Sequence, residues 1–141
     1  MKLLYLDLDG VMCLPEQWGN RFKHKRKFDS FDPKCVKGLN TIITTTACDI
    51  IITSDWRKFG TLEELQWHFS NQKVCKVPIG VTLDLDYDRD AEIVYSLDSY
   101  LPSKWVAVDD LPLNVANFVQ TKESQGIKYY STVNKIISYL I

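Results

Sequence analysis

The fold is decided by the stretch KLLYLDLDGV, which occupies residues 2–11. The apolar run at residues 3–6 is continuous rather than alternating, which is typical of a strand buried on both faces of a parallel sheet. Asp7 and Asp9 end this run, and Gly10 permits a sharp turn directly after them. Because parallel strands are joined by crossovers that are usually helical, this opening predicts an α/β protein.

The remaining sequence alternates between strand and helix patterns. Further strands are expected at residues 49–53, within 74–81, at 105–108 and at 127–130. Helices are expected from Pro33 behind the N-cap Asp32, from the capping box at Thr61 through Phe69, over 91–101, over about 113–122, and after Thr132. The pattern predicts one domain over residues 1–141, a three-layer, doubly wound, Rossmann-like parallel sheet of about five strands.

Composition places the chain among ordinary globular proteins. It has 141 residues, of which 45% are hydrophobic and 25% charged, so a disordered, collagen-like or coiled-coil chain is not expected. The net charge of -1 gives no overall attraction to nucleic acid or membrane. No apolar run is long enough to span a membrane, residues 1–8 do not make a signal peptide, and the four cysteines form no CxxC pair. We therefore expect reduced thiols in a cytoplasmic protein.

Acidic and hydroxyl side chains gather where the predicted strands end. They are Asp7 and Asp9 after the first strand, Thr53, Ser54 and Asp55 after the second, and Asp109 and Asp110 after the fourth. In open α/β sheets, ligands bind beyond the carboxyl ends of the strands, so these side chains should share one crevice. Clustered carboxylates stay ionised only when a cation lies among them, and an all-oxygen ligand set favours Mg²⁺.

These motifs resemble those of the haloacid dehalogenase (HAD) superfamily of phosphohydrolases. The sequence DLDGV at residues 7–11 resembles the first motif, Thr53-Ser54 the second, and Asp109-Asp110 the acidic fourth. The stretches ITSDWR at 52–57 and RDAEI at 89–93 resemble a small subgroup associated with RNA-repair proteins, and the chain is also similar to the phosphatase half of phage polynucleotide kinases. The resemblance covers nearly the whole chain, in the family's order, and implies a HAD-like fold.

The resemblance also implies roles for individual residues. Asp7 would be the nucleophile that forms an aspartyl-phosphate, and Asp9 would protonate the leaving oxygen and then activate water. Thr53 would bind a phosphoryl oxygen, with help from backbone amides near Ser54, while Gly10 would allow the turn beside the phosphate. The Mg²⁺ ligands implied are Asp7, the backbone carbonyl of Asp9, Asp109 and Asp110.

The family also needs a cation beside the nucleophile and phosphate. Arg89 opens the helix that leads into the fourth strand, where that residue usually lies, and is the favoured candidate. Arg57, just after the second motif, is the alternative. A surface Arg89 paired with Asp90 or Glu92 is the non-functional interpretation.

Residues 11–31 form a basic loop insertion near the expected site. The sequence RFKHKRK at 21–27 holds five Lys or Arg residues and no acid, so Lys23, Lys25 and Arg26 could bind neighbouring phosphates of a nucleotide or nucleic-acid end. Trp18 and Phe22 could stack on a base. A solvated, mobile loop is the alternative, and both interpretations stay open.

Several other residues have simpler expected roles. His24 and His68 are expected at the surface because neither has a partner at metal-ligand spacing. Trp67 and Phe69 are expected to pack in or near the core, and Trp56 either lines the site or packs. The LDLD at residues 83–86 repeats residues 6–9 without the glycine, so Asp84, Asp86 and Asp88 are expected to form a solvated acidic edge.

The sequence leaves little room for a cap domain over the site. An open site suits a bulky substrate such as a nucleic-acid end, or closure by a second copy of the chain or a partner chain. The favoured function is a Mg²⁺-dependent phosphomonoester hydrolase acting on nucleotides, polynucleotide ends or small phosphate esters. The alternative is a phosphate- or nucleic-acid-binding subunit without turnover. A signalling receiver domain is disfavoured, because such domains carry an adjacent acid pair after strand one, whereas here it follows the fourth strand.

Overall fold

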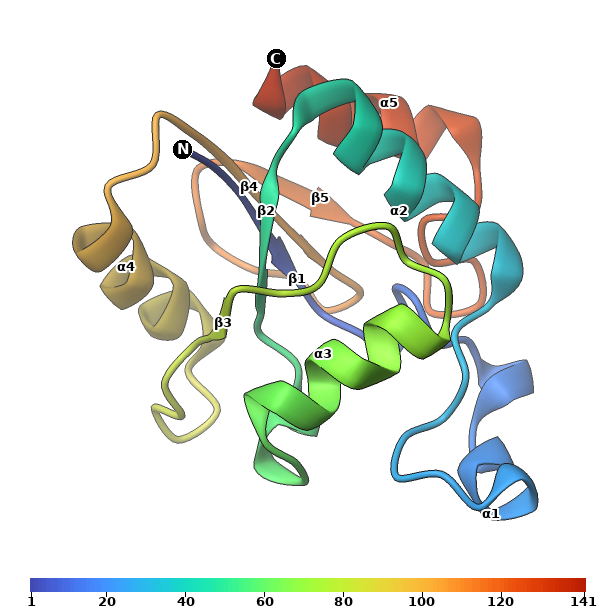
Figure 1. Ribbon diagram of the computed structural model, residues 1–141. Helices are drawn as coiled ribbons and strands as arrows, with labels where there is room; N and C mark the ends of the chain where they lie inside the picture. The colour runs from blue at the N-terminus through green and yellow to red at the C-terminus, as the bar shows by residue number, and fades with distance from the viewer.

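A computed structural model describes residues 1–141 and shows a five-stranded parallel sheet of order β3-β2-β1-β4-β5 (Figure 1). The strands are β1 (Lys2–Leu6), β2 (Asp49–Ile52), β3 (Gly80–Val81), β4 (Lys104–Asp109) and β5 (Phe118–Gln120). The helices are α1 (Asn20–His24), α2 (Pro33–Thr46), α3 (Leu62–Asn71), α4 (Arg89–Tyr100) and α5 (Tyr130–Leu140), with short 3₁₀ helices at Pro15–Gln17 and Asp55–Lys58. The predicted α/β class with an open parallel sheet is confirmed.

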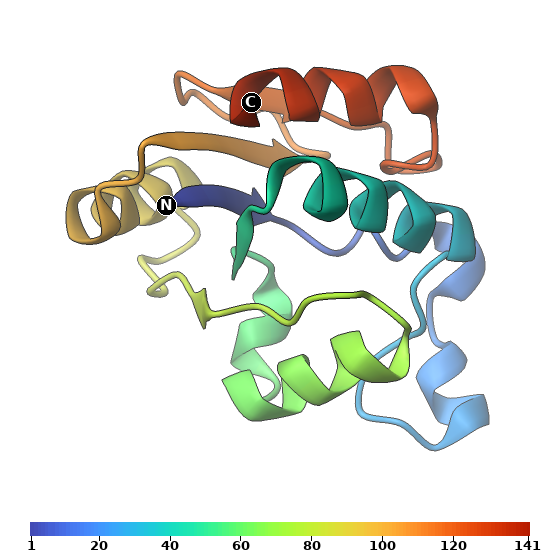
Figure 2. The same ribbon diagram turned by 45° about the horizontal axis from the view of Figure 1, so that its top comes forward.

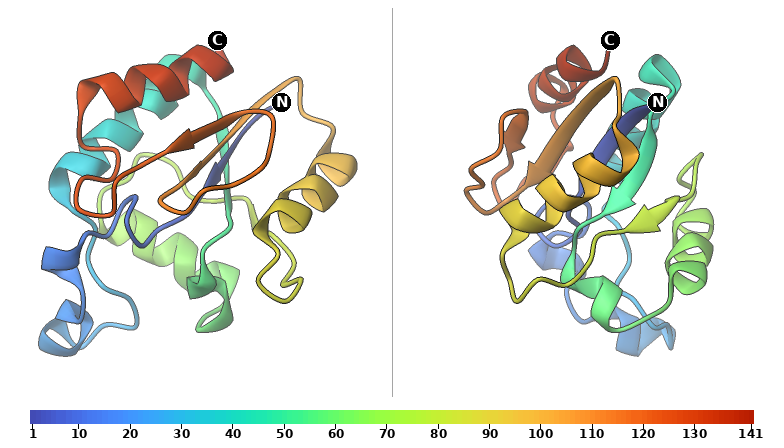
Figure 3. Two further views of the ribbon diagram at one scale, coloured as in Figure 1. Left: turned by 180° about the vertical axis from the view of Figure 1, so that it is seen from behind. Right: turned by 90° about the vertical axis from the view of Figure 1, so that its left-hand side faces the viewer.

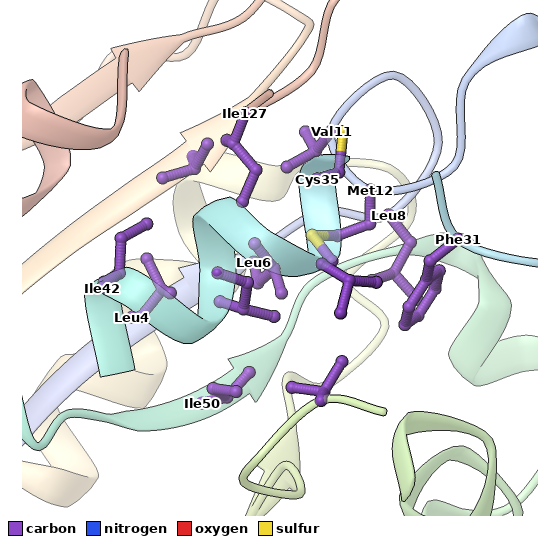
Figure 4. Close-up of a cluster of buried hydrophobic side chains, with 14 of the residues drawn as sticks. Leu4, Leu6, Leu8, Val11, Met12, Phe31, Cys35, Ile42, Ile50 and Ile127 are labelled. Atoms are coloured by element: carbon purple, nitrogen blue, oxygen red, sulfur yellow. The ribbon is translucent and has the colours of Figure 1, made fainter. Parts of the chain in front are cut away.

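The central strand β1 alternates between two cores, one on each face of the sheet. Leu4 and Leu6 belong to the larger core, beneath α2 and α5, together with Ile50 and Ile42 (Figure 4). Leu3 and Tyr5 face the smaller core, which includes Ile93 of α4. Because both faces of β1 are covered, its sequence is hydrophobic at every position from Leu3 to Leu6.

The helices form two outer layers. Helices α2 and α5 lie side by side over one face of the sheet, and α4 covers the other face (Figures 2 and 3). The predicted helix starts are confirmed at two places: the Asp32 carboxylate accepts from the N–H groups of Lys34 and Cys35, and Thr61 with Glu64 forms the capping box of α3. No helix is long and apolar enough to cross a membrane.

Two expected elements near the C-terminus are wrong. The segment expected as a helix at 113–122 contains β5 instead, and Val119 of this strand is buried against the sheet. Phe118 and Val119 have side chains that favour strands, and this segment pairs with the outer edge of β4. It therefore forms a strand, although its apolar spacing suits a helix.

The strand expected at 127–130 is absent. Ile127 is buried, but its N–H donates to the Val11 carbonyl oxygen in the N-terminal loop, so it fills the core from a turn rather than from a strand. Helix α5 then begins at Tyr130, with Tyr129 as its N-cap, and not behind Thr132.

The segment at residues 11–31 holds only the 3₁₀ helix Pro15–Gln17 and the short helix α1, and no inserted domain covers the carboxyl end of the sheet. Figure 1 shows α1, α3 and the 3₁₀ turn after β2 on the side toward which β1 points. The expectation of an architecture without a large cap is therefore confirmed, and this edge is left open.

Candidate active site

Three adjacent strands bring the predicted acidic and hydroxyl residues together. Asp7 directly follows β1, and its N–H donates to the Val108 carbonyl oxygen of β4 over 3.1 Å. Thr53 directly follows β2, and its N–H donates to the Leu6 carbonyl oxygen over 3.1 Å. Asp109 ends β4. Continued pairing beyond the strand ends thus holds the side chains of Asp7, Thr53 and Asp109 at one buried edge of the sheet.

Asp7, Asp109 and Asp110 form a cluster of oxygen donors. One carboxylate oxygen from each residue lies within 4.8 Å of the others. Burial, followed by repulsion from Asp109, raises the pKa of Asp7 well above its usual value. Burial and contact with Asp109 raise the pKa of Asp110 to about 6. The three carboxylates are therefore held closer than their charges favour, which is the electrostatic environment of a cation site.

Gly10 makes this crowding possible. Its backbone has a φ of 78°, in the left-handed region, and a Cβ at this position would lie 2.5 Å from Asp110 Oδ2. The Thr121 hydroxyl donates to the Gly10 carbonyl oxygen over 2.8 Å, which fixes the turn from the β5 side. Any other residue at position 10 would strain the turn and displace Asp110.

Arg89 is the cation that reaches the acidic cluster. Its guanidinium donates to Asp109 Oδ2 over 2.7 Å and lies 3.4 Å from Asp7 Oδ1 and 3.5 Å from Asp55 Oδ1. Burial lowers the pKa of Arg89, but the carboxylates of Asp7 and Asp109 raise it by more, so the net pKa is raised. Arg89 is thus a charged side chain beside the predicted nucleophile.

Arg57, the alternative cation, points elsewhere. Its guanidinium donates to the backbone carbonyl oxygens of Thr53 and Ser54, and its Nη2 lies 2.7 Å from Glu92 Oε2. Arg57 does not line the cavity at the acidic cluster, and the Arg57 and Glu92 side chains are almost completely buried. Its contacts hold the second motif against α4 rather than extend toward the open edge.

Asp9 lies outside the cluster of Asp7, Asp109 and Asp110. Its Oδ2 accepts from Trp56 Nε1–H over 3.0 Å, and the Trp56 ring stacks on Phe28 with 5.2 Å between ring centroids. Burial raises the pKa of Asp9, although the hydrogen bond from Trp56 partly opposes this change. Trp56 therefore both packs and lines the site, and its N–H fixes the orientation of the Asp9 carboxyl group.

A cavity of about 970 Å³ opens at this edge. Its lining includes the charged residues of the site, Asp7, Asp9, Arg89 and Asp110. Aromatic and basic side chains line it as well: Trp18, Arg21, Lys27, Phe28, Trp56 and Phe59. The cavity is large enough for a substrate much bigger than a phosphate ion. The aromatic wall from Phe28 and Phe59 is not visible in the sequence, because both residues lie in loops without periodicity.

The basic segment is only partly at this cavity. Arg21 and Lys27 line it, whereas Lys23, Lys25 and Arg26 do not, so binding of neighbouring phosphates by these three residues stays a prediction. The buried Asp29 carboxylate accepts from the N–H groups of Gly19 and Arg21, which fixes the start of this segment. Trp18 lines the cavity, but Phe22 is exposed outside it.

Two expectations about α3 are wrong and one about the acidic edge agrees with the structure. His68 is buried, and its Nε2 bonds to the Asp29 carbonyl oxygen over 2.9 Å, while the neighbouring Trp67 is exposed. The second LDLD copy lies in the exposed turn before α4, where Asp88 caps that helix. Asp84 and Asp86 are solvated, as expected.

Comparisons with known proteins agree with this geometry. No curated protein and no solved structure matches the chain. A family model described as "HAD domain in Swiss Army Knife RNA repair proteins" matches residues 3–131, a span that includes all the strand-end residues above. This family suggests a phosphohydrolase-type function. The chain therefore belongs to the family of HAD domains found in Swiss Army Knife RNA repair proteins.

Proposed function

We propose that the protein is a Mg²⁺-dependent phosphomonoesterase that works through an aspartyl-phosphate on Asp7. The observation that carries this proposal is the division of the acids into two sets. Asp7, Asp109 and Asp110 form one oxygen cluster, whereas Asp9 is held separately by Trp56 at the same cavity. Binding a phosphate needs no such second carboxylate, but transferring a proton to a leaving group does.

The residues present fit a divalent cation. When ionised, Asp7, Asp109 and Asp110 carry three negative charges, and Arg89 supplies one positive charge, so an excess of two remains. All the donors are oxygen atoms, which Mg²⁺ prefers. The backbone carbonyl of Asp9 receives no hydrogen bond from a backbone N–H and would be the fourth protein ligand. When bound, Mg²⁺ would neutralise charge on the phosphoryl group and reduce its repulsion of Asp7.

The first step forms a covalent intermediate. A carboxylate oxygen of Asp7 attacks phosphorus in line with the ester bond, and the bond from phosphorus to the leaving oxygen breaks. Asp9 gives its proton to that oxygen, so the substrate leaves as a neutral alcohol. Desolvation raises the pKa of Asp9 above its usual value, which favours the protonated form that this transfer needs.

The second step releases phosphate. Asp9, now a carboxylate, removes a proton from a water molecule, which attacks phosphorus as the bond from phosphorus to Asp7 breaks. Inorganic phosphate leaves, and Asp7 and Asp9 return to their starting states. Arg89 would stabilise the transferred phosphoryl oxygens, together with the Thr53 hydroxyl and the amides near Ser54.

Turnover of an aryl phosphate tests this proposal. We expect hydrolysis of 4-nitrophenyl phosphate with Mg²⁺, no hydrolysis after EDTA treatment, and recovery when Mg²⁺ is returned. Asp7→Asn keeps the shape of the side chain and should lose more than about a thousandfold in kcat, as expected when a nucleophile is removed. Normal turnover by Asp7→Asn would refute the assignment of the nucleophile. Tight phosphate binding without any turnover by the native protein would favour the non-catalytic alternative.

A substrate screen would separate the substrate classes. It should compare sugar phosphates, nucleoside monophosphates and oligonucleotides that carry a 3′- or 5′-phosphate, each with and without EDTA. The size of the cavity and its aromatic lining favour the nucleotide and oligonucleotide substrates.

A further inference from the structure

Trp67 is an exposed tryptophan beside a group of cations. It lies on α3 with 61% of its surface exposed, although the next two residues, His68 and Phe69, are buried. It lines a second cavity, of about 330 Å³, together with Lys25, Arg26, Lys27, Phe28, Glu64 and His68. An exposed aromatic ring next to positive charges is the combination that binds an unpaired base and its phosphates.

Two of the three basic side chains in this second cavity are available to a ligand. Lys27 forms an ion pair with Glu64 over 2.8 Å, so it contributes little net charge. Lys25 and Arg26 form no ion pair with any carboxylate of the chain, and both are outside the catalytic cavity. Two uncompensated cations therefore lie beside Trp67, which suits the phosphate backbone of a nucleic acid.

The basic segment is held in place rather than free. The buried Asp29 carboxylate accepts from the N–H groups of Gly19 and Arg21 and from the Arg21 guanidinium, each over 3.0 or 3.1 Å. The Asp29 carbonyl oxygen bonds to His68 of α3. Asp29 thus fixes the segment that contains Lys25 and Arg26 to the helix that carries Trp67, and less ordering entropy is lost when a ligand binds.

The two cavities share a wall. Lys27 and Phe28 line both of them, and the Phe28 ring stacks on Trp56, whose N–H bonds to Asp9. Helices α1 and α3 also lie on the same side of the molecule, at the open edge of the sheet (Figures 1 and 2). A chain that leaves the catalytic cavity across Lys27 and Phe28 would therefore reach Trp67 next.

We propose that the cavity at Trp67 binds a single-stranded polynucleotide whose terminal phosphate lies at Asp7, with a base stacked on Trp67 and backbone phosphates at Lys25 and Arg26. This inference rests on the proposed function, and it names the substrate as a polynucleotide end rather than a free mononucleotide. The strand must be unpaired near its end, because a base can stack on Trp67 only when it is not inside a duplex.

A binding measurement tests this inference without turnover. Fluorescence anisotropy would follow a dye-labelled, single-stranded 3′- or 5′-phosphorylated oligonucleotide, in RNA and DNA versions, bound to the full chain with Mg²⁺. We expect Trp67→Ala to weaken binding by about tenfold or more, since stacking on one base contributes about 1–3 kcal/mol. Lys25→Gln/Arg26→Gln should weaken binding similarly and reduce its dependence on salt. A nucleoside monophosphate should bind the native protein and Trp67→Ala equally.

Matched controls separate this effect from a general loss of structure. Tyr130→Ala removes an aromatic residue of similar exposure from α5, and Lys135→Gln removes a cation from the same helix. Both should bind oligonucleotides as the native protein does. Hydrolysis of 4-nitrophenyl phosphate should remain within about twofold for Trp67→Ala, while its kcat/KM on the oligonucleotide falls about tenfold, because only the long substrate reaches the second cavity.

The possible outcomes are distinct. Loss of oligonucleotide affinity in Trp67→Ala, with aryl phosphate hydrolysis intact, supports both the proposed function and this inference. The same loss of affinity in a protein that hydrolyses nothing supports the second cavity but refutes the phosphatase. Unchanged oligonucleotide affinity in both Trp67→Ala and Lys25→Gln/Arg26→Gln, or tighter binding of duplex than of single strand by the native protein, overturns this inference.

Discussion

Arg57 Nη2 lies 2.7 Å from Glu92 Oε2 in the interior between the turn after β2 and helix α4, and both side chains are almost completely buried. Arg57 also donates to the carbonyl oxygens of Thr53 and Ser54, and Glu92 accepts from the Leu85 N–H. The pair thus connects the second motif to the helix that begins at Arg89. It positions the residues around the acidic cluster without contacting the cluster itself.

The first prediction concerns the stability of this pair. Arg57→Met should lower the free energy of unfolding by about 3 kcal/mol, because it leaves the Glu92 carboxylate buried without its partner. The double variant Arg57→Met/Glu92→Gln should be destabilised by less than the sum of the two single variants. Urea denaturation of the four proteins measures these free energies. Strictly additive losses would show that the two side chains do not interact energetically.

The second prediction distinguishes the two candidate cations. Arg89→Gln should reduce kcat on an aryl phosphate by about a hundredfold or more, because a charge-assisted donor to the phosphoryl oxygens is lost. Arg89→Lys should recover part of this loss, since a lysine restores the charge but not the paired hydrogen bonds. Steady-state kinetics with saturating Mg²⁺ makes the comparison, and thermal unfolding checks the fold of each variant. Full activity in Arg89→Gln would exclude Arg89 from catalysis.

A third prediction concerns the orientation of Asp9. Trp56→Phe keeps an aromatic ring against Phe28 but removes the N–H that bonds to Asp9 Oδ2. We expect kcat to fall by about tenfold, which corresponds to about 1.4 kcal/mol, with little change in KM. Phe59→Leu provides a control, because Phe59 lines the same cavity without bonding to an acid. The assignment of Trp56 as a positioning residue would be contradicted by an unchanged kcat.

A fourth prediction concerns pH and stability through His68. Burial lowers the pKa of His68 from its usual 6.5 to about 4, and its Nε2 must carry the proton that bonds to the Asp29 carbonyl oxygen. The unfolded chain therefore binds more protons than the native protein between about pH 6.5 and pH 4. Stability should be complete above pH 6.5 and fall by about 3 kcal/mol as the pH decreases to 4.

The measurement is the free energy of unfolding in urea at several pH values. His68→Gln should lose most of the pH dependence between 6.5 and 4, whereas His24→Gln, which changes an exposed histidine of α1, should keep it. Equal pH dependence in the native protein and in His68→Gln would show that other groups cause the acid destabilisation.

Much of the fold could be predicted because local signals and burial agree along the N-terminal half. The continuous apolar run of β1, the Asp32 cap and the Thr61 capping box each identify their element from a few adjacent residues. Near the C-terminus the secondary structure is determined by contacts between residues that are far apart in the sequence. Residues 113–122 have apolar spacing that suits a helix, but the open edge of β4 pairs with Phe118–Gln120.

In the candidate site, too, some residues could be placed from the sequence and others could not. Asp7, Thr53 and Asp109 could be placed together, because parallel strands end at the same edge of a sheet. The contacts of Arg57, His68 and Trp67 could not, since each depends on what lies across the fold: Glu92 for Arg57, Asp29 for His68, and solvent for Trp67.

The most direct test of Asp7 as the nucleophile is to locate the phosphoryl group on the protein. Asp9→Asn cannot activate water, yet 4-nitrophenolate leaves readily without a proton, so this variant should form the intermediate and fail to hydrolyse it. After incubation with Mg²⁺ and 4-nitrophenyl phosphate, acid quenching and peptide mass spectrometry should find the phosphoryl group on Asp7. A phosphoryl group on another residue, or no phosphoryl group on a variant that still releases a stoichiometric burst of 4-nitrophenolate, would contradict the assignment of Asp7 as the nucleophile.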